Sequence, residues 1–283
     1  MPLVTSKEML SKAQKGGYAV GAFNAENMEM VKAIIQAAEE LKAPVMIQTT
    51  PSTVKYGTVE TYAAIVAAEA AKASVPVCLH LDHGSSFELA MQAMHAGYTS
   101  VMIDGSKLDF EANIAETKRV ADVAKALDIP CEAELGKVGG KEDDLEAEAD
   151  TNTDPQEAKE FVERTGVTSL AVAIGTAHGF YVGTPVLDKE RLSEIREVVD
   201  IPIVLHGASG LSDEDVMDCV KRGICKVNFA TELRAAYSKA VKELLAEKPD
   251  TIDPKAYGKT AIAAVKELVM ARMKVCGCDG KAE

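Results

Sequence analysis

The stretch "VPVCLHLDHG" at residues 75–84 gives the first strong indication of the fold. The run is almost entirely apolar and stops at a glycine, so we expect a buried strand from Val75 to Leu81. This strand delivers a carboxylate, Asp82, and an imidazole, His83, to its end. Buried strands that end in such polar side chains usually end at a functional site.

Two later apolar runs end in the same way. The run "SLAVAIGTAHG" at 169–179 brings His178 to a glycine, and "IPIVLHGASG" at 201–210 brings His206 to another. Together with His83 they place three imidazoles at strand ends, one of them beside a carboxylate. This pattern predicts a three-histidine metal centre with an open coordination position.

Short apolar runs alternate with amphipathic helical patterns along the whole chain. Because most of these runs are apolar throughout, we expect strands that are covered on both faces. About eight such units without a break in composition predict an α/β fold, a (β/α)8 barrel with an extra C-terminal helix, as one domain over residues 1–283. The predicted strands are Ala19–Asn24, Pro44–Thr50, Val75–Leu81, Ser100–Asp104, Cys131–Leu135, Ser169–Ile174, Ile201–Leu205 and Lys226–Phe229.

Two segments interrupt this alternation. The polar, acidic stretch "KVGGKEDDLEAEADTNTDPQ" at 137–156 is long for a loop, so it predicts a lid, a binding loop or disorder before a helix that begins near Pro155. From Asp253 onward the pattern predicts the extra helix, which ends at Gly277 with a poorly structured end beyond it.

Composition narrows the class of protein. The chain has 283 residues, 47% of them apolar, and 31 basic against 44 acidic residues give a net charge of −13. This balance argues against nucleic acid and membrane surfaces as partners. Since no export signal or apolar stretch of ~20 residues is visible, we expect a cytoplasmic enzyme. The six cysteines are then expected to be reduced thiols, and the "CGC" at 276–278 is not expected to bind metal.

Chemically useful residues follow nearly every predicted strand, where barrel active sites lie. Asp82 and Glu142 offer carboxylates for acid and base roles. The segments "HGASG" and "NFATE" offer backbone amides and small hydroxyls, which suit a phosphate. His80 is interpreted as a core or supporting residue, and His95 as a helix residue. Among the remaining strand-end candidates, Asn24 and Thr50 are expected to contact the substrate. The others are Asp104, Ser106, Glu132, Glu134, Ser209, Asn228 and Thr231.

The motifs "HLDHG", "EAELGKVGGKED", "GTAHG", "VLHGASG" and "KVNFATEL" together resemble the class II, metal-dependent ketose-bisphosphate aldolases. The likeness runs from "AVGAFN" to "VCG", essentially the whole chain. It is closest to the shorter subgroup, which contains tagatose- and fructose-bisphosphate aldolases. The resemblance implies a Zn²⁺ cofactor, with a monovalent cation as a further candidate, and chemistry without a Schiff-base lysine.

The resemblance also implies roles for individual residues. His83, His178 and His206 would bind zinc, and Asp82 would move the proton on the carbon 4 oxygen of the ketose. Glu142 would exchange the proton at carbon 3 of dihydroxyacetone phosphate. Asp104 and Glu134 would lie near an alternative metal location or behind the primary ligands. Positions matching those that hold the triose phosphate are Gly179, Gly207, Ala208, Ser209, Asn228, Ala230 and Thr231.

The resemblance favours tagatose 1,6-bisphosphate as substrate, cleaved reversibly to dihydroxyacetone phosphate and glyceraldehyde 3-phosphate. Ala230 stands where longer fructose-cleaving members carry aspartate. The epimers differ only at carbon 4, so the fructose 1,6-bisphosphate aldolase of glycolysis is the alternative. A zinc-dependent barrel hydrolase and a non-catalytic accessory subunit are more distant alternatives. The expected assembly is a homodimer or homotetramer, with an accessory subunit as a candidate partner.

Overall fold

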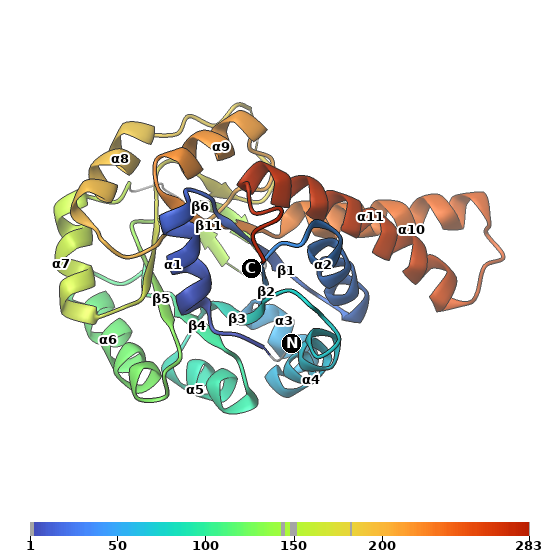
Figure 1. The fold of residues 1–283 in the computed structure, drawn as a ribbon, viewed down its shortest axis with the longest axis horizontal. Helices are drawn as coiled ribbons and strands as arrows, with labels where there is room; N and C mark the ends of the chain where they lie inside the picture. The colour runs from blue at the N-terminus through green and yellow to red at the C-terminus, as the bar shows by residue number, and fades with distance from the viewer. Residues whose placement is uncertain (1–2, 143–144, 148–151, 182, 283) are drawn as a thin grey trace.

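A computed structural model describes residues 3–142, 145–147, 152–181 and 183–282; for 141–142 and 145–147 it describes the backbone alone. Eight parallel strands close into a barrel, in the order β1-β11-β10-β8-β5-β4-β3-β2 (Figure 1). The (β/α)8 prediction is therefore confirmed. The barrel strands are β1 Val20–Asn24, β2 Val45–Thr49, β3 Val77–Gly84, β4 Ser100–Ile103, β5 Cys131–Leu135, β8 Ser169–Val172, β10 Ile203–Leu205 and β11 Ile224–Phe229.

Helices surround the barrel, and most carry the end signals that their sequences predict. In one of them, Met28–Leu41, the side chain of Asn27 accepts a hydrogen bond from the amide of Met30 and so caps the first turn. Its buried face turns apolar side chains toward the strands. The helices are α1 Ser6–Gly16, α2 Met28–Leu41, α3 Pro51–Gly57, α4 Val59–Ala70, α5 Phe87–Ala96, α6 Phe110–Ala126, α7 Pro155–Thr165, α8 Lys189–Val198, α9 Asp213–Lys221, α10 Thr231–Glu247 and α11 Pro254–Cys276.

The barrel strands are buried along their whole length, as the apolar runs predict. Each of the eight predicted strands is present, with ends that differ by a few residues. The largest difference that bears on the site is in β3, which continues to Gly84 instead of ending at Leu81. Consequently Asp82 and His83 are among the last residues of the strand and do not lie in a loop after it.

The polar stretch at 137–156 contains strands that its sequence did not predict. A small sheet forms from β6 (Gly139–Glu142), β7 (Leu145–Ala147) and β9 (Ala177–His178). β6 runs antiparallel to β7 and parallel to β9, with Gly140 opposite His178. Its glycines and charges have low strand propensity, so the pairing depends on a partner that lies far away in the chain.

The C-terminal end also differs from the prediction. After α11, Gly277 ends the helix in a left-handed conformation with φ of 71°. The chain beyond is held against α2, because the amide of Gly280 donates to the carbonyl of Leu41 and that of Ala282 to the carbonyl of Lys42. In Figure 1, α10 and α11 pair and extend beyond the barrel as a hairpin. Among the described helices, none combines the length and apolar character needed to cross a membrane. All six cysteines are buried and free.

Candidate metal centre and active site

The site begins with an irregularity at the end of β3. Between Leu81 and Gly84 the strand uses one more residue than β4 does, which is a β-bulge. His83 takes a left-handed backbone conformation, with φ of 48°, which costs about 1–3 kcal/mol for a residue with a side chain. A regular strand would send neighbouring side chains to opposite faces. The bulge instead lets both Asp82 and His83 reach the interior polar network.

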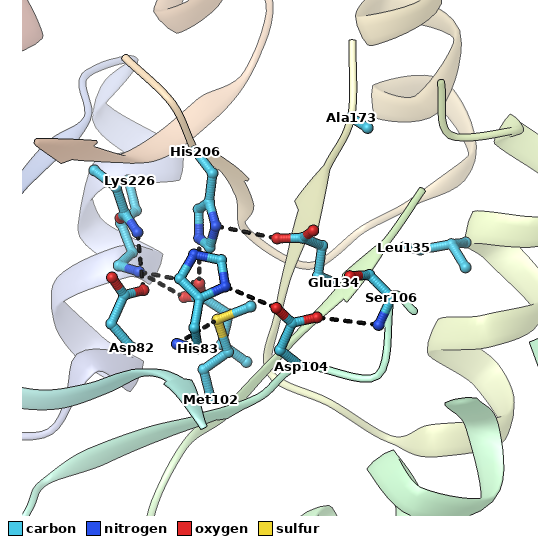
Figure 2. A network of polar contacts seen from close by, with 12 residues as sticks. Asp82, His83, Met102, Asp104, Ser106, Glu134, Leu135, Ala173, His206 and Lys226 are labelled. Atoms are coloured by element: carbon cyan, nitrogen blue, oxygen red, sulfur yellow. Dashed lines mark hydrogen bonds and ion pairs between the residues drawn. The ribbon is translucent and has the colours of Figure 1, made fainter. Parts of the chain in front are cut away.

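Gly84 makes this bulge sterically feasible. A Cβ at this position would lie 2.1 Å from the carbonyl oxygen of Met102 on β4, which is far inside contact distance. The sulfur of Met102 also lies 3.4 Å from the amide nitrogen of His83. Figure 2 shows His83 above Met102 and turned toward His206. The glycine that ends the apolar run thus serves close packing of two strands.

Three histidines converge at the carboxyl end of the barrel. His83 comes from the bulge, His178 from β9 and His206 from the residue after β10. One nitrogen of each lies within 4.8 Å of the others. The ring centroid of His83 is 5.0 Å from that of His178 and 4.7 Å from that of His206. Residues separated by 123 positions in the chain are therefore brought to one point.

Acidic side chains orient two of these rings. The Nδ1 atom of His83 lies 2.8 Å from Oδ2 of Asp104, so its other nitrogen, Nε2, is directed away from that carboxylate (Figure 2). The Nε2 atom of His206 lies 3.1 Å from Oε1 of Glu132, and its Nδ1 lies 3.1 Å from Oε2 of Glu134. Such contacts fix the orientation of metal-binding imidazoles.

A second group of donor atoms overlaps the first. His83, Asp104 and Glu134 each offer an atom within 4.8 Å of the other two. Asp104 is further held by the amide of Ser106, which donates to its Oδ1 at 3.0 Å. The two carboxylates therefore lie beside the three-histidine group, where they could bind a metal in an alternative position or orient its ligands.

Asp82 is held in a separate polar network. The side-chain amide of Asn24 donates to its Oδ2 at 2.9 Å, and that of Asn228 donates to its Oδ1 at 3.1 Å. Gln48 in turn donates to the side-chain oxygen of Asn24 at 2.9 Å. Burial raises the pKa of Asp82, but His83 and other cationic neighbours outweigh this and lower it to about 2. The carboxylate is therefore ionised at neutral pH.

The histidines differ in charge. Burial lowers the pKa of His206, but hydrogen bonds to Glu132 and Glu134 outweigh it and raise the pKa to about 9. Burial likewise opposes protonation of His83, yet the charge of Asp82 and the bond to Asp104 hold its pKa well above the usual value. Burial and the two other histidines keep the pKa of His178 well below it. Without a metal, the site therefore holds protonated and neutral imidazoles side by side.

The arrangement fits a divalent metal with nitrogen ligands. A tetrahedral Zn²⁺ with bonds of about 2.0–2.1 Å places its ligand nitrogens about 3.4 Å apart, which agrees with donor atoms that all lie within 4.8 Å. The nitrogens of His83 and His206 that face away from Asp104 and Glu132 are buried, as is Nε2 of His178. Carboxylates behind two of the ligands supply compensating negative charge.

The predicted phosphate-binding segments lie next to this cluster in the chain. The hydroxyl of Ser209 accepts a hydrogen bond from the amide of Ala230 at 3.3 Å, which joins the loops after β10 and β11. The Tyr181 hydroxyl accepts from the amide of Ala177 at 2.8 Å and donates to the carbonyl of Gly207 at 2.6 Å. Helix α10 starts directly after Ala230 and has no side-chain cap at its N-terminus.

Other predicted residues have varied positions. Thr50 caps α3 by accepting from the amide of Thr53. Glu142 is the last residue of β6, and its side chain lies outside the described part of the structure. His80 is buried in the barrel, with Nδ1 2.8 Å from the hydroxyl of Ser100. His95 is exposed on α5. Gly179, Gly207, Ala208, Asn228 and Thr231 all follow or end the strands of the site.

Lys226 and Glu132 are buried polar residues whose roles the sequence did not indicate. Both lie at strand positions inside the barrel, and their side chains form an ion pair. The available signal was alternation with period 2, which puts Glu132 on the same face as Glu134, and Lys226 on the same face as Asn228. Sequence alone could not pair them, because they lie 94 positions apart.

Comparison with known proteins places this geometry in a family. Residues 4–281 match the model of the family described as fructose-bisphosphate aldolase class-II. The chain belongs to this family. This class II aldolase is therefore a carbon–carbon lyase of the kind that cleaves ketose bisphosphates.

Solved structures agree with this placement. The YdjI aldolase from Escherichia coli K12 is 40% identical, with a TM-score of 0.90 over 99% of this chain and 100% of that one. A Coccidioides immitis protein proposed to be a fructose-1,6-bisphosphate aldolase is 32% identical, with a TM-score of 0.90 over 97% and 96%. The fructose-bisphosphate aldolase of Campylobacter jejuni, 21% identical with a TM-score of 0.84 over 99% and 97%, shares the fold.

Proposed function

We propose that this class II aldolase depends on Zn²⁺ and reversibly cleaves tagatose 1,6-bisphosphate to dihydroxyacetone phosphate and glyceraldehyde 3-phosphate. The observation that carries the proposal is the convergence of His83, His178 and His206 beside the ionised Asp82. When bound, the metal would supply Lewis-acid stabilisation of negative charge on substrate oxygens. The histidines hold it, and the other residues bind the substrate and move protons.

Asp82 is the proposed acceptor of the proton on the carbon 4 hydroxyl during cleavage. Its carboxylate is ionised, and the amides of Asn24 and Asn228 hold both of its oxygens. A carboxylate fixed in this way keeps its position relative to His83, its neighbour in the chain. In the condensation direction the protonated carboxyl group would return the proton to the aldehyde oxygen.

Glu142 is the proposed group for the proton at carbon 3 of dihydroxyacetone phosphate. Support comes from the backbone, because Glu142 follows Gly140 by two residues and Gly140 pairs with His178. The strand that carries Glu142 is thus registered against the strand that carries a proposed metal ligand. Separate carboxylates for the two protons would allow each step its own acid or base.

The proposed phosphate site lies at the ends of β10 and β11. Gly207, Ala208 and Ser209 follow His206 directly, and α10 presents uncapped backbone amides after Ala230. A helix N-terminus and glycine-rich backbone favour a phosphate dianion. Gly179, Asn228 and Thr231 complete the proposed contacts. A metal-dependent hydrolase would not need such a phosphate site, which favours the aldolase reaction over that alternative.

Preference for tagatose over fructose bisphosphate rests on Ala230. Its amide donates to the hydroxyl of Ser209, and its small side chain is buried, two positions after Asn228, which donates to Asp82. The family description and the Coccidioides immitis relative are named for the fructose epimer, which keeps fructose 1,6-bisphosphate as the second candidate. The epimers differ at the carbon whose oxygen Asp82 is proposed to serve, so nearby side chains can set the preference.

Cleavage of both bisphosphates by the purified protein tests the proposal. The enzyme would be assayed as isolated, after removal of metal with a chelator, and after addition of zinc, cobalt or magnesium. We expect chelation to abolish cleavage, zinc or cobalt to restore it, and tagatose 1,6-bisphosphate to give the higher kcat/KM. Full activity without metal would overturn the zinc proposal, whereas a higher kcat/KM for the fructose epimer would overturn only the substrate preference.

Assembly and location belong to the same proposal. We infer a cytoplasmic homodimer or homotetramer, with a monovalent cation as a second cofactor. The feature that supports an assembly is the outer part of the α10–α11 hairpin, which extends beyond the barrel (Figure 1). Light scattering on the purified protein would give the number of subunits, and a monomeric mass would refute this part. Copurification of a different polypeptide would favour the accessory-subunit alternative.

A further inference from the structure

Beneath the three histidines lies a charged pair that the proposed reaction does not use. The ammonium group of Lys226, which Figure 2 shows on the side of His206 and Asp82, donates to both carboxylate oxygens of Glu132, at 3.0 Å each. Neither side chain is more than 1% exposed. Removing two charges from water costs several kcal/mol per ion, which offsets much of their attraction. Stability alone is therefore a weak explanation for a charged pair at this depth.

The same carboxylate contacts a proposed metal ligand. Oε1 of Glu132 lies 3.1 Å from Nε2 of His206, while its Oε2 lies 3.4 Å from the hydroxyl of Ser169. A carboxylate paired with an ammonium group is ionised and can only accept hydrogen bonds. Without a metal, His206 carries a proton on both nitrogens, because Nδ1 lies 3.1 Å from Oε2 of Glu134 and the pKa is raised to about 9. When one proton leaves, the ammonium-held carboxylate of Glu132 favours keeping the other on Nε2, and Nδ1 is then the nitrogen for a metal.

We propose that Lys226 and Glu132 act as a positioning pair that fixes the ring orientation and tautomer of His206. Lys226 holds both oxygens and so sets the plane of the carboxylate, and Glu132 transmits this geometry to the imidazole. The inference rests on the proposed function, since it requires a metal at His206. Lys226 thus acts on the proposed metal ligand His206 through Glu132. This role differs from that of a lysine that forms a Schiff base with a ketone.

The contrast with His83 supports this assignment. His83 is oriented by Asp104, a carboxylate at the rim that is held by the amide of Ser106. His206 faces the barrel interior, where few backbone groups are available to hold a carboxylate because the strand ladder uses them. A buried ammonium group with several donors does the same task there.

Two matched double variants separate positioning from charge burial. Glu132→Gln/Lys226→Met removes both charges and keeps an oxygen that accepts from Nε2 of His206. Glu132→Leu/Lys226→Met removes both charges and the acceptor. Zinc affinity would be measured by competition with a chromogenic chelator, and the fold would be monitored by circular dichroism and thermal unfolding of the metal-free proteins. We expect the leucine variant to bind zinc 10–100-fold more weakly than the glutamine variant.

Nitrogen-15 NMR of histidine-labelled wild-type protein tests the tautomer without any change in the core. In the zinc-loaded protein, the ring absent from the spectrum of His206→Asn should carry its proton on Nε2 and bind metal through Nδ1. A proton on Nδ1, or equal zinc affinities in the two folded double variants, would overturn the positioning role. This measurement decides the question even if the leucine variant fails to fold.

Two further outcomes distinguish the inference from the proposed function. If wild-type protein binds no metal through His206, the proposed zinc centre itself fails. If borohydride reduction in the presence of dihydroxyacetone phosphate attaches the triose to Lys226, the lysine is a nucleophile and the positioning role is wrong. We expect no adduct, because the Lys226 ammonium group is engaged by Glu132 on both oxygens.

Discussion

Metal binding to this aldolase should expel protons, because two of the three proposed ligands are protonated when the metal is absent. The pKa of His206 is raised to about 9, and that of His83 lies well above its usual value. His178 has a lowered pKa and is neutral at pH 7. Since only a neutral imidazole binds a metal ion, His83 and His206 must each lose a proton.

The size of the effect follows from the pKa of His206. A pH of 7 lies about two units below this pKa, and each unit corresponds to about 1.4 kcal/mol. Deprotonation of His206 alone therefore costs about 2.7 kcal/mol, or a factor of about 100 in apparent zinc affinity. His83 adds to this penalty. Between pH 7 and pH 8, where His206 remains mostly protonated, release of its proton should raise the apparent affinity by about tenfold, and release of a proton by His83 should add to this rise.

Calorimetric titration of metal-free protein with zinc measures the proton count. Titrations at pH 7.5 in buffers with different enthalpies of ionisation should show about one proton released from His206 per zinc ion, and a further contribution from His83. His95→Ala serves as the control, since His95 is exposed on α5, and it should leave the count unchanged. Zero protons released, with an affinity that does not change between pH 7 and pH 8, would refute the charge states derived from the carboxylates around these rings.

The remaining predictions concern single residues. His83→Ala should remove zinc and lower kcat/KM by at least about 1000-fold, because the Lewis acid contributes several kcal/mol, whereas His95→Ala should change neither; equal damage would contradict the site assignment. Asp82→Ala should stop cleavage and spare hydrogen exchange at carbon 3 of dihydroxyacetone phosphate. Glu142→Ala should keep the metal and greatly slow this exchange. Parallel loss of both half-reactions in both variants would refute separate roles. Ala230→Asp should shift the ratio of kcat/KM values toward fructose 1,6-bisphosphate by about tenfold, and an unchanged ratio with both activities retained would place specificity elsewhere.

The stability of the metal-free protein should also depend on pH. A folded-state pKa raised to about 9 means that His206 stabilises the fold fully below the pKa of an unfolded histidine, about 6.5. This contribution is lost as the pH rises from about 6.5 through 9. Thermal unfolding of metal-free protein should accordingly show a falling Tm over this range. A Tm that rises with pH would contradict the sign of the shift.

The barrel could be predicted from the sequence because its strands are buried on both faces. Continuous apolar runs such as the one in β3 cannot lie at a surface, and their alternation with helices leaves few topologies. The bulge was not predictable in the same way. It depends on the approach of Gly84 to the carbonyl of Met102, a contact between strands that no local pattern records. The pairing of β6 with β9 likewise depends on His178, far along the chain.

The candidate site also contains residues that local sequence patterns predicted and residues whose roles depend on long-range contacts. The histidines follow apolar runs, so their positions at strand ends were visible in the sequence. Asn24 was expected to contact substrate, whereas the structure also makes it a donor to Asp82. The roles of Glu132 and Lys226 depend on the ion pair that they form across the barrel, and a buried charge in a strand cannot be explained until its partner is known. Contacts between residues that lie far apart in the chain leave no local pattern from which they could be predicted.

The bulge at the end of β3 has a mechanical consequence. Asp82 and His83 are neighbours in the chain, so their Cα atoms are held about 3.8 Å apart by a covalent link whatever the surrounding loops do. The spacing between the proposed proton acceptor and one metal ligand is thus protected from fluctuations that move whole elements. His178 and His206 have no such link to Asp82. Mutations that loosen the barrel should therefore widen the distances to these two histidines while the Asp82–His83 spacing stays the same.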